Sequence, residues 1–212
     1  MGAHENSPDM APVSKESPND QELVQRYLRG EAQAFDQLYD RHHRSVFLLV
    51  RQYFPQRQRA EEVFQEIFMK LLDRLDRFQS EGSFRAWLFT LSRNHCIDRL
   101  RYQARRPETP ASAFGDPEEG NNILEHADAT EGNQEDKAYE KQLGEQLQGA
   151  LDKLPEEQRE TFLLKESGGL TFEEIAQTMG VSVNTAKSRM RYALAHLRRV
   201  LRGKGFVKEA RT

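Results

Sequence analysis

The sequence lacks the features that mark secreted, disulfide-bonded and membrane-spanning proteins. Its single cysteine, Cys96, excludes an intramolecular disulfide and fits a reducing cytoplasm. No apolar run is long enough to cross a membrane, so no membrane insertion is expected. The first residues show no basic stretch followed by an apolar one, as a secretory signal would. We therefore expect a cytoplasmic protein.

Motifs for catalysis and for metal or cofactor binding are also missing. There is no glycine-rich loop that could cradle a phosphate and no H-E-x-x-H pair. His42 and His43 are adjacent, as are His95 and Cys96, and neighbours in sequence do not share one helix face. These pairs make poor joint metal ligands. We expect no enzyme, no metal and no cofactor.

No stretch shows the sustained alternation that is typical of strands, whereas apolar residues recur at helical spacing. The sequence therefore predicts an all-α protein of two small helical domains, the C-terminal one a helix-turn-helix. In the N-terminal domain, helices are expected to begin near Asp20, Glu31, Gln58 and Ser83, with Asp20 as the first cap.

Charge divides the chain in the same way. Residues 21–106 carry sixteen basic and eleven acidic side chains, and residues 141–212 carry thirteen and nine, but residues 107–140 carry one and ten. Two basic blocks beside an acidic one indicate two DNA-contacting domains joined by a flexible acidic linker. The expected boundaries are a disordered tail at 1–19, domains at 20–106 and 139–205, the linker at 107–138, and a tail at 206–212.

The stretch from Thr171 to Leu201 predicts the helix-turn-helix. Thr171 and Glu174 form a capping box, Gly180 suits the left-handed end of a helix, and Ser182 can cap the next one. Nine basic residues against one acid follow between positions 183 and 211, which favours DNA over a merely solvated helical hairpin. The polar face of the second helix has side-chain types that read a major groove: Asn184, Lys187, Ser188, Arg191 and Arg198.

Two further segments, both in the predicted N-terminal domain, differ in charge. Residues 83–106 hold six arginines and one acid, with aromatic residues in or beside them, a combination that suits unstacked nucleic acid. Two of these aromatics, Phe84 and Trp87, lie on the apolar stripe and are expected in the core. The third helix instead begins with acids, which would repel phosphate and better suit a basic protein partner.

Three segments together resemble bacterial sigma factors, and more narrowly the extracytoplasmic-function (ECF) group. They are AEEVFQEIFMKLLDRLDRF, GSFRAWLFTLSRNHCIDRLR and LPEEQRETFLLKESGGLTFEEIAQTMGVSVNTAKSRMRYALAHLRRVL, in the order of the family. The resemblance covers about residues 20–106 and 139–202. It implies a factor that binds core RNA polymerase and directs it to promoters. The implied partners are the clamp helices of the largest polymerase subunit, promoter DNA and an anti-sigma factor.

The same resemblance implies roles for matching residues. The segment that docks on the polymerase matches Glu61, Glu62, Gln65 and Glu66. The loop and helix that capture bases of the −10 element match Phe78, Ser80, Ser83, Arg93, Asn94 and Asp98. The helix that reads the −35 element matches Asn184, Thr185, Lys187, Ser188 and Arg191.

Two other functions are compatible with the residues alone. A conventional helix-turn-helix regulator would bind promoter duplex tightly without polymerase, usually at symmetric half-sites. A protein-interaction adaptor would use the basic faces to bind an acidic partner, and the salt dependence of duplex binding would separate it from the other two.

Overall fold

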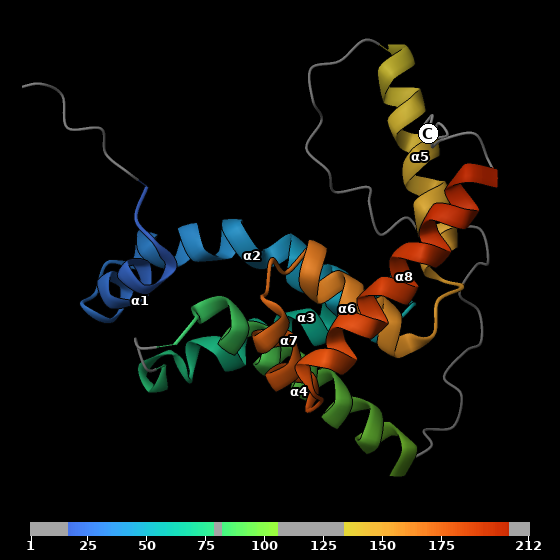
Figure 1. Cartoon of the computed structure of the whole chain (residues 1–212). Coiled ribbons are helices and arrows are strands. Elements are labelled where there is room, and N and C mark those ends of the chain that lie inside the picture. Colours follow the sequence, from blue (N-terminus) through green and yellow to red (C-terminus); the bar gives the residue numbers. More distant parts are fainter. Residues whose placement is uncertain (1–16, 79–81, 106–133, 204–212) are drawn as a thin grey trace, which may run out of the picture.

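The structure, a computed structural model, describes residues 17–78, 82–105 and 134–203. All regular structure within these residues is helical, which confirms the all-α prediction (Figure 1). The elements are α1 (Asp20–Leu28), α2 (Ala32–Tyr53), α3 (Arg57–Leu72), the short 3₁₀ helix η1 (Leu75–Arg77), α4 (Phe84–Arg105), α5 (Gln134–Leu151), α6 (Glu156–Glu166), α7 (Phe172–Met179) and α8 (Val183–Gly203). The linker apart from residues 134–138, residues 1–16 of the first predicted tail and the whole of the second lie outside the described residues.

The first helix is capped by Asn19, so the prediction that Asp20 caps it is wrong. The Asn19 side chain accepts from the Glu22 backbone N–H, and the Glu22 carboxylate accepts from that of Asn19, both at 2.9 Å. Asp20 instead joins α1 to α2, because its oxygens lie 2.9 Å from His42 Nε2 and 3.0 Å from Arg41 Nη1. Burial raises the pKa of Asp20, but these partners outweigh it and hold the pKa below its usual value.

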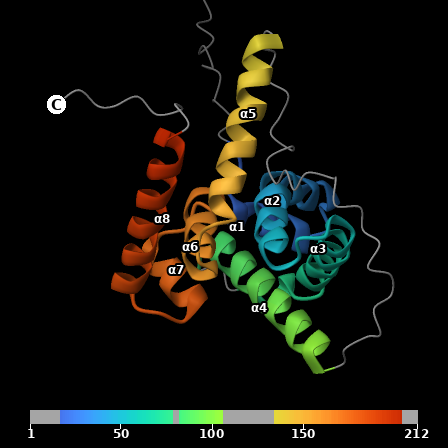
Figure 2. The same cartoon turned by 90° about the vertical axis from the view of Figure 1, so that its right-hand side faces the viewer.

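The C-terminal domain consists of α5 to α8, with α5 packed on α8. Its small local core joins Ala150, Leu151 and Leu154 to Ala193 and Leu197. Helix α5 begins at Gln134, so its first turn lies in the segment 107–138 that was expected to be linker. The upper part of α5 projects beyond the other helices (Figure 2).

A larger apolar core runs through both domains. It includes Phe84 and Phe89 of α4 together with Leu164, Leu170 and Ile175 of the C-terminal domain, each 1% exposed or less. Helix α7 contacts α4, and α6 contacts α2 (Figure 1). Because burying a large apolar side chain contributes about 1.5–3 kcal/mol, this shared cluster holds the domains against each other.

None of the helices in the described ranges is both long and apolar enough to cross a membrane.

Replacing Thr171 by Ala is expected to lower the free energy of unfolding by about 1 kcal/mol, the usual effect of losing an N-cap. Its hydroxyl accepts from the Glu174 backbone N–H at 3.2 Å, which otherwise has no helical partner. Thr171→Ser keeps the hydroxyl and should stay close to wild type. Urea unfolding followed by circular dichroism measures both. Equal destabilisation by the two variants would show that the hydroxyl bond contributes little.

Candidate nucleic-acid and polymerase interfaces

The helix-turn-helix has the local geometry that the sequence predicts. Thr171 and Glu174 form a reciprocal capping box at the start of α7, with Glu174 Oε2 accepting from the Thr171 backbone N–H at 2.7 Å. Gly180 ends α7 with φ at +67°, where a side chain would be strained. Ser182 then caps α8, since its Oγ accepts from the Thr185 backbone N–H at 3.1 Å. These signals end α7 at Gly180 and begin α8 after Ser182.

The predicted −35 residues lie along α8, away from the core. Asn184, Lys187 and Arg191 are exposed, and Ser188 is half-buried. Thr185 is half-buried, and its hydroxyl lies 2.8 Å from that of Ser182, so it takes part in the helix cap. The opposite face packs inward through Ala186, Met190, Ala193 and Leu197. The basic face is therefore accessible to a ligand as large as a DNA duplex.

Aromatic rings beside this face were not predicted as site residues. The Phe172 ring lies between two lysines, with Lys187 Nζ at 5.9 Å and Lys165 Nζ at 5.2 Å from its centroid. The Arg191 guanidinium lies 5.2 Å from the Tyr192 ring, which is 56% exposed. Such cation–π contacts orient the cations. The sequence signal was present, since Tyr192 directly follows Arg191, but Phe172 fits equally well on the apolar face.

The predicted −10 loop, residues 78–83, begins at Phe78, whose ring packs against other aromatic rings, and ends at Ser83, which caps α4. Phe78 is half-buried and stacks edge-on against Phe84, with centroids 5.5 Å apart, and it also contacts Trp87 at 5.5 Å. Ser83 Oγ accepts from the Ala86 backbone N–H at 3.2 Å and so caps α4. Ser80 lies outside the described residues. Phe84 and Trp87 pack in or against the core, as predicted.

The three −10 residues predicted on α4 have different environments. Asn94 and Asp98 are exposed. Arg93 faces the C-terminal domain, where its Nε donates to Glu160 Oε1 at 2.7 Å. Glu160 is 3% exposed and also accepts from Tyr53 Oη at 2.5 Å. Sequence reasoning missed Glu160 and Tyr53, because neither departs from the pattern of an ordinary amphipathic helix.

The predicted docking residues lie on one side of α3. Gln65, Glu61 and Glu62 are exposed. Both acids carry basic partners on their own helix, Arg57 at 2.9 Å and Arg59 at 2.7 Å. Together with α4, this side of α3 forms an open groove lined by Glu62, Gln65, Glu66, Met69, Lys70, Asp73 and His95.

Glu66 is less free than its neighbours. Its carboxylate lies 2.8 Å from His95 Nε2 and 3.3 Å from Arg99 Nε, both on α4. It therefore links the docking groove to the helix that carries the predicted −10 residues. Met69 extends the groove with a side chain that is 62% exposed.

No cluster of three or more His, Cys, Asp or Glu side chains in the described part of the chain is arranged to hold a metal ion. Cys96 is buried, and burial raises the pKa of its thiol to about 12. A protonated, buried thiol is a small core residue and a poor nucleophile.

Comparison with known families matches each domain separately. The Sigma-70 region 2 family matches residues 38–106, and the Sigma-70, region 4 family matches residues 144–197. The chain is 34% identical over 176 residues to the ECF RNA polymerase sigma-E factor of Escherichia coli, covering 82% of this chain and 90% of that protein. It is 30% identical over 173 residues to the RNA polymerase sigma-H factor of Pseudomonas aeruginosa, covering 81% and 88%.

Solved structures share the fold. The structure of CnrH in complex with the cytosolic domain of CnrY superposes with a TM-score of 0.57 at 24% identity, over 87% of this chain and 97% of that one. RpoE of Bartonella quintana, in complex with the anti-sigma factor NepR, gives 0.59 at 23% identity, over 79% and 96%. Together with the family matches and the relatives, this shows that the chain belongs to the ECF group of bacterial RNA polymerase sigma factors, non-enzymatic proteins that direct RNA polymerase to promoters.

Proposed function

We propose that α8 of this sigma factor reads the −35 element as duplex DNA. The observation that carries the proposal is its face of one charge sign, on which Asn184, Lys187 and Arg191 are all exposed while the opposite face is buried. Arginine and lysine pair with guanine, and asparagine pairs with adenine, in the major groove. Ser182 caps the start of α8, and residues at this end of a recognition helix usually contact bases.

The N-terminal domain would hold bases of the −10 element after strand opening. Asn94 and Asp98 offer exposed polar groups on α4, and Phe78 stands at the start of the predicted loop 78–83. Taking a base out of the stack costs a few kcal/mol, which stacking and hydrogen bonding in a pocket offset. Arg93 would contact the strand beside them once it is free of Glu160.

Docking on the clamp helices of the polymerase would use the exposed acids and Gln65 on α3, which suit a basic partner surface. The linker would then bridge the two promoter elements. Elements about 20 base pairs apart span about 70 Å at ~3.4 Å per pair. A linker of roughly 30 residues reaches about 100 Å at ~3.3 Å per residue, so it is long enough.

An anti-sigma factor is a further proposed partner, as it is for the similar RpoE of Bartonella quintana. The chain would act in the cytoplasm, where it meets RNA polymerase. Membership of the sigma family decides against the conventional regulator and the adaptor, the two other functions compatible with the residues alone.

Alanine at Arg191 or at Lys187 should reduce −35-dependent initiation. A lost base contact costs about 1–3 kcal/mol and relaxes the preference at one position, whereas a lost phosphate contact weakens all sequences alike. Transcription by the reconstituted holoenzyme on a library of −35 variants distinguishes these cases. Arg198→Ala is the control, because Arg198 is exposed on the same helix about two turns further on and should affect all sequences equally. Unchanged promoter use in both test variants would overturn the proposed recognition face.

A further inference from the structure

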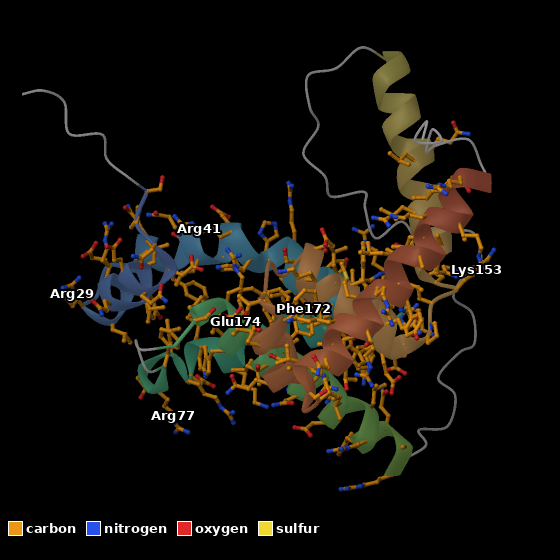
Figure 3. The ribbon with its side chains drawn as sticks, viewed as in Figure 1. Arg29, Arg41, Arg77, Lys153, Phe172 and Glu174 are labelled. Atoms are coloured by element: carbon orange, nitrogen blue, oxygen red, sulfur yellow. The ribbon has the colours of Figure 1, made fainter. Side chains whose placement is uncertain are left out.

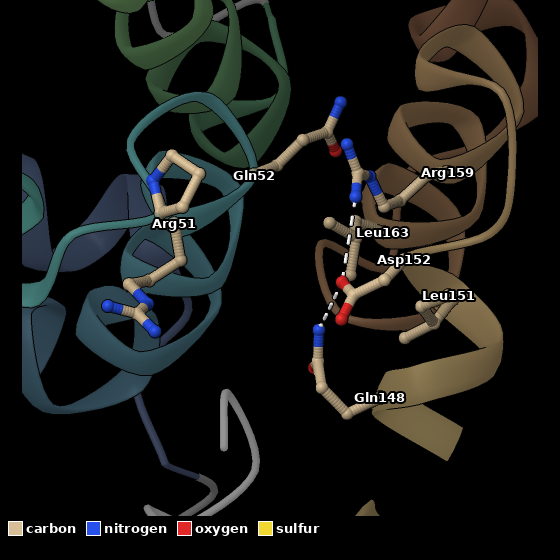
Figure 4. Close-up of a pocket in the computed structure, with 8 residues that line it drawn as sticks. Arg51, Gln52, Gln148, Leu151, Asp152, Arg159 and Leu163 are labelled. Atoms are coloured by element: carbon tan, nitrogen blue, oxygen red, sulfur yellow. Dashed lines mark hydrogen bonds and ion pairs between the residues drawn. The ribbon is translucent and has the colours of Figure 1, made fainter. Parts of the chain in front are cut away.

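A cavity of about 200 Å³ lies between the end of α2 on one side and α5 and α6 on the other (Figure 4). Its polar lining consists of Arg51, Gln52, Gln148, Asp152 and Arg159, and apolar side chains complete its wall. It shares no residue with the α3 groove or with the proposed −10 and −35 residues. A single water needs only about 10–15 Å³ of such a cavity, so there is room for a small ligand.

Three buried polar atoms that line this cavity have no hydrogen-bond partner among the described residues. They are Gln52 Oε1, Gln148 Oε1 and Arg159 Nε. The two glutamines come from opposite walls and are 7% and 5% exposed. An unpaired buried polar group costs free energy, and buried polar groups in native proteins are almost always paired. The cavity therefore calls for an occupant that pairs with all three atoms.

The orientation of both glutamine amides is set by their nitrogen atoms. Gln52 Nε2 donates to the Glu156 backbone carbonyl at 3.3 Å, and Gln148 Nε2 donates to Asp152 Oδ1 at 2.7 Å. Because the nitrogens are used in this way, the two amide oxygens are the groups left for an occupant. Arg159 Nε can only donate. The occupant must therefore bring hydrogens for two acceptors and an oxygen for one guanidinium.

The charged side chains around the cavity favour an anion. Two are basic, Arg51 and Arg159, and one is acidic, Asp152, whose Oδ1 lies 3.6 Å from Arg159 Nη1. Arg51 is 8% exposed, and a buried cation is stabilised by negative charge nearby. Dihydrogen phosphate fits both requirements, because it has one negative charge, two hydrogens to donate and two oxygens without hydrogens to accept. Sulfate has the same tetrahedral shape, but near neutral pH it has no hydrogen to donate.

We propose that this cavity is a binding site for inorganic phosphate, taken up as its monoanion. Gln52 and Gln148 accept its two hydrogens, and Arg159 donates to an oxygen that has none. Hydrogen bonds with an ionised partner are the stronger ones, and arginine is a common phosphate ligand. Asp152 adds to the selectivity, since its negative charge repels the sulfate dianion more than a monoanion. The site is independent of the proposed promoter contacts, because it uses none of their residues.

Isothermal titration calorimetry of the full-length chain tests the site. The titrations use inorganic phosphate and sulfate at equal ionic strength, at a mildly acid pH where the phosphate monoanion dominates. Phosphate should bind at least about tenfold more tightly, the factor for one hydrogen bond to a charged group that sulfate cannot make. The exposed basic face of α8 would instead prefer the more highly charged sulfate. Equal or tighter binding of sulfate, or no phosphate binding at all, would overturn the site.

Arg159→Gln removes the guanidinium donor and one positive charge from the cavity, and it should weaken phosphate binding by about tenfold or more. The matched control is Lys153→Gln, which makes the same change in net charge. Lys153 is exposed between α5 and α6, where Figure 3 labels it, and it does not line the cavity. The control should bind phosphate as the wild type does. An equal loss in the two variants would mean that only the net charge matters, which contradicts a site in the cavity.

Gln52→Leu tests the opposite wall without a change in charge. It removes one of the two acceptors at a similar side-chain size, so phosphate should bind about tenfold more weakly while sulfate binding stays the same. Far-ultraviolet circular dichroism checks that each variant keeps its helicity. Glycerol 3-phosphate distinguishes free phosphate from a phosphate ester, because the phosphate group of its monoanion has a single hydrogen to donate, and it should bind more weakly than inorganic phosphate. Tighter binding of the ester, or an unchanged phosphate affinity in Gln52→Leu, would show that the proposed occupant is wrong.

Discussion

The double variant Glu62→Arg/Gln65→Ala is expected to bind core RNA polymerase about tenfold more weakly or worse, with its helicity unchanged. Both side chains are exposed on α3, so neither fills the core. A reversed charge in a docking face meets a basic partner surface, and like charges placed together cost several kcal/mol, where 1.4 kcal/mol corresponds to a factor of ten. A core-polymerase pull-down and far-ultraviolet circular dichroism measure the two properties side by side.

A matched control comes from α2. Asp36 and Gln37 are also an exposed acid and an exposed glutamine, but they lie outside the α3 groove. Asp36→Arg/Gln37→Ala makes the same change in net charge and in helix composition, and it should bind polymerase normally. Normal retention of the α3 variant on core polymerase would contradict the docking proposal. An equal loss of binding in both variants would show that the loss comes from the change in net charge.

Glu66 is expected to contribute less to docking than its position in sequence implies. Its carboxylate is already committed to His95 and Arg99 on α4. The part of the groove that is not held by α4 is therefore Glu62, Gln65 and the exposed Met69.

The sequence predicts the helices and the helix-turn-helix well because their signals are local. The capping box at Thr171, the left-handed Gly180 and the cap at Ser182 all lie within a few residues of the backbone groups they satisfy. The prediction of the first helix cap fails because the signal that decides it is not local. Asn19 and Asp20 are both good caps, and the choice between them depends on His42, which is 22 positions from Asp20.

The packing of the two domains could not be predicted in the same way. Thr90 and Thr178 look like ordinary polar helix residues, and they meet across 88 positions of sequence. Glu160 lies on α6 among acids that face solvent, yet it is buried because Arg93 and Tyr53 reach it from the other domain. Periodicity identifies which face of a helix is apolar, but not which other helix covers it.

Phe89→Ala is expected to lower the free energy of unfolding by about 3–5 kcal/mol. The ring is 1% exposed and lies in the core that the two domains share. Its tip packs close to Gly168 of the C-terminal domain, so that even a β-carbon at Gly168 would come within 3.2 Å of it. Losing the ring should therefore weaken the N-terminal domain and also release the C-terminal domain from it.

Calorimetric unfolding distinguishes the release of the C-terminal domain from the general effect of losing a buried aromatic ring. The wild-type chain should unfold in one cooperative transition, because a shared core couples its two halves, and Phe89→Ala should split it into two. Phe84→Ala is the control, since Phe84 is equally buried on the same helix, and the aromatic rings that pack against it, those of His42, Phe78 and Trp87, belong to the N-terminal domain. It should cost a similar free energy while keeping one transition. Two separate transitions already present in the wild type, with only one of them shifted by Phe89→Ala, would mean that the apolar contact between the domains adds little to the stability of the chain.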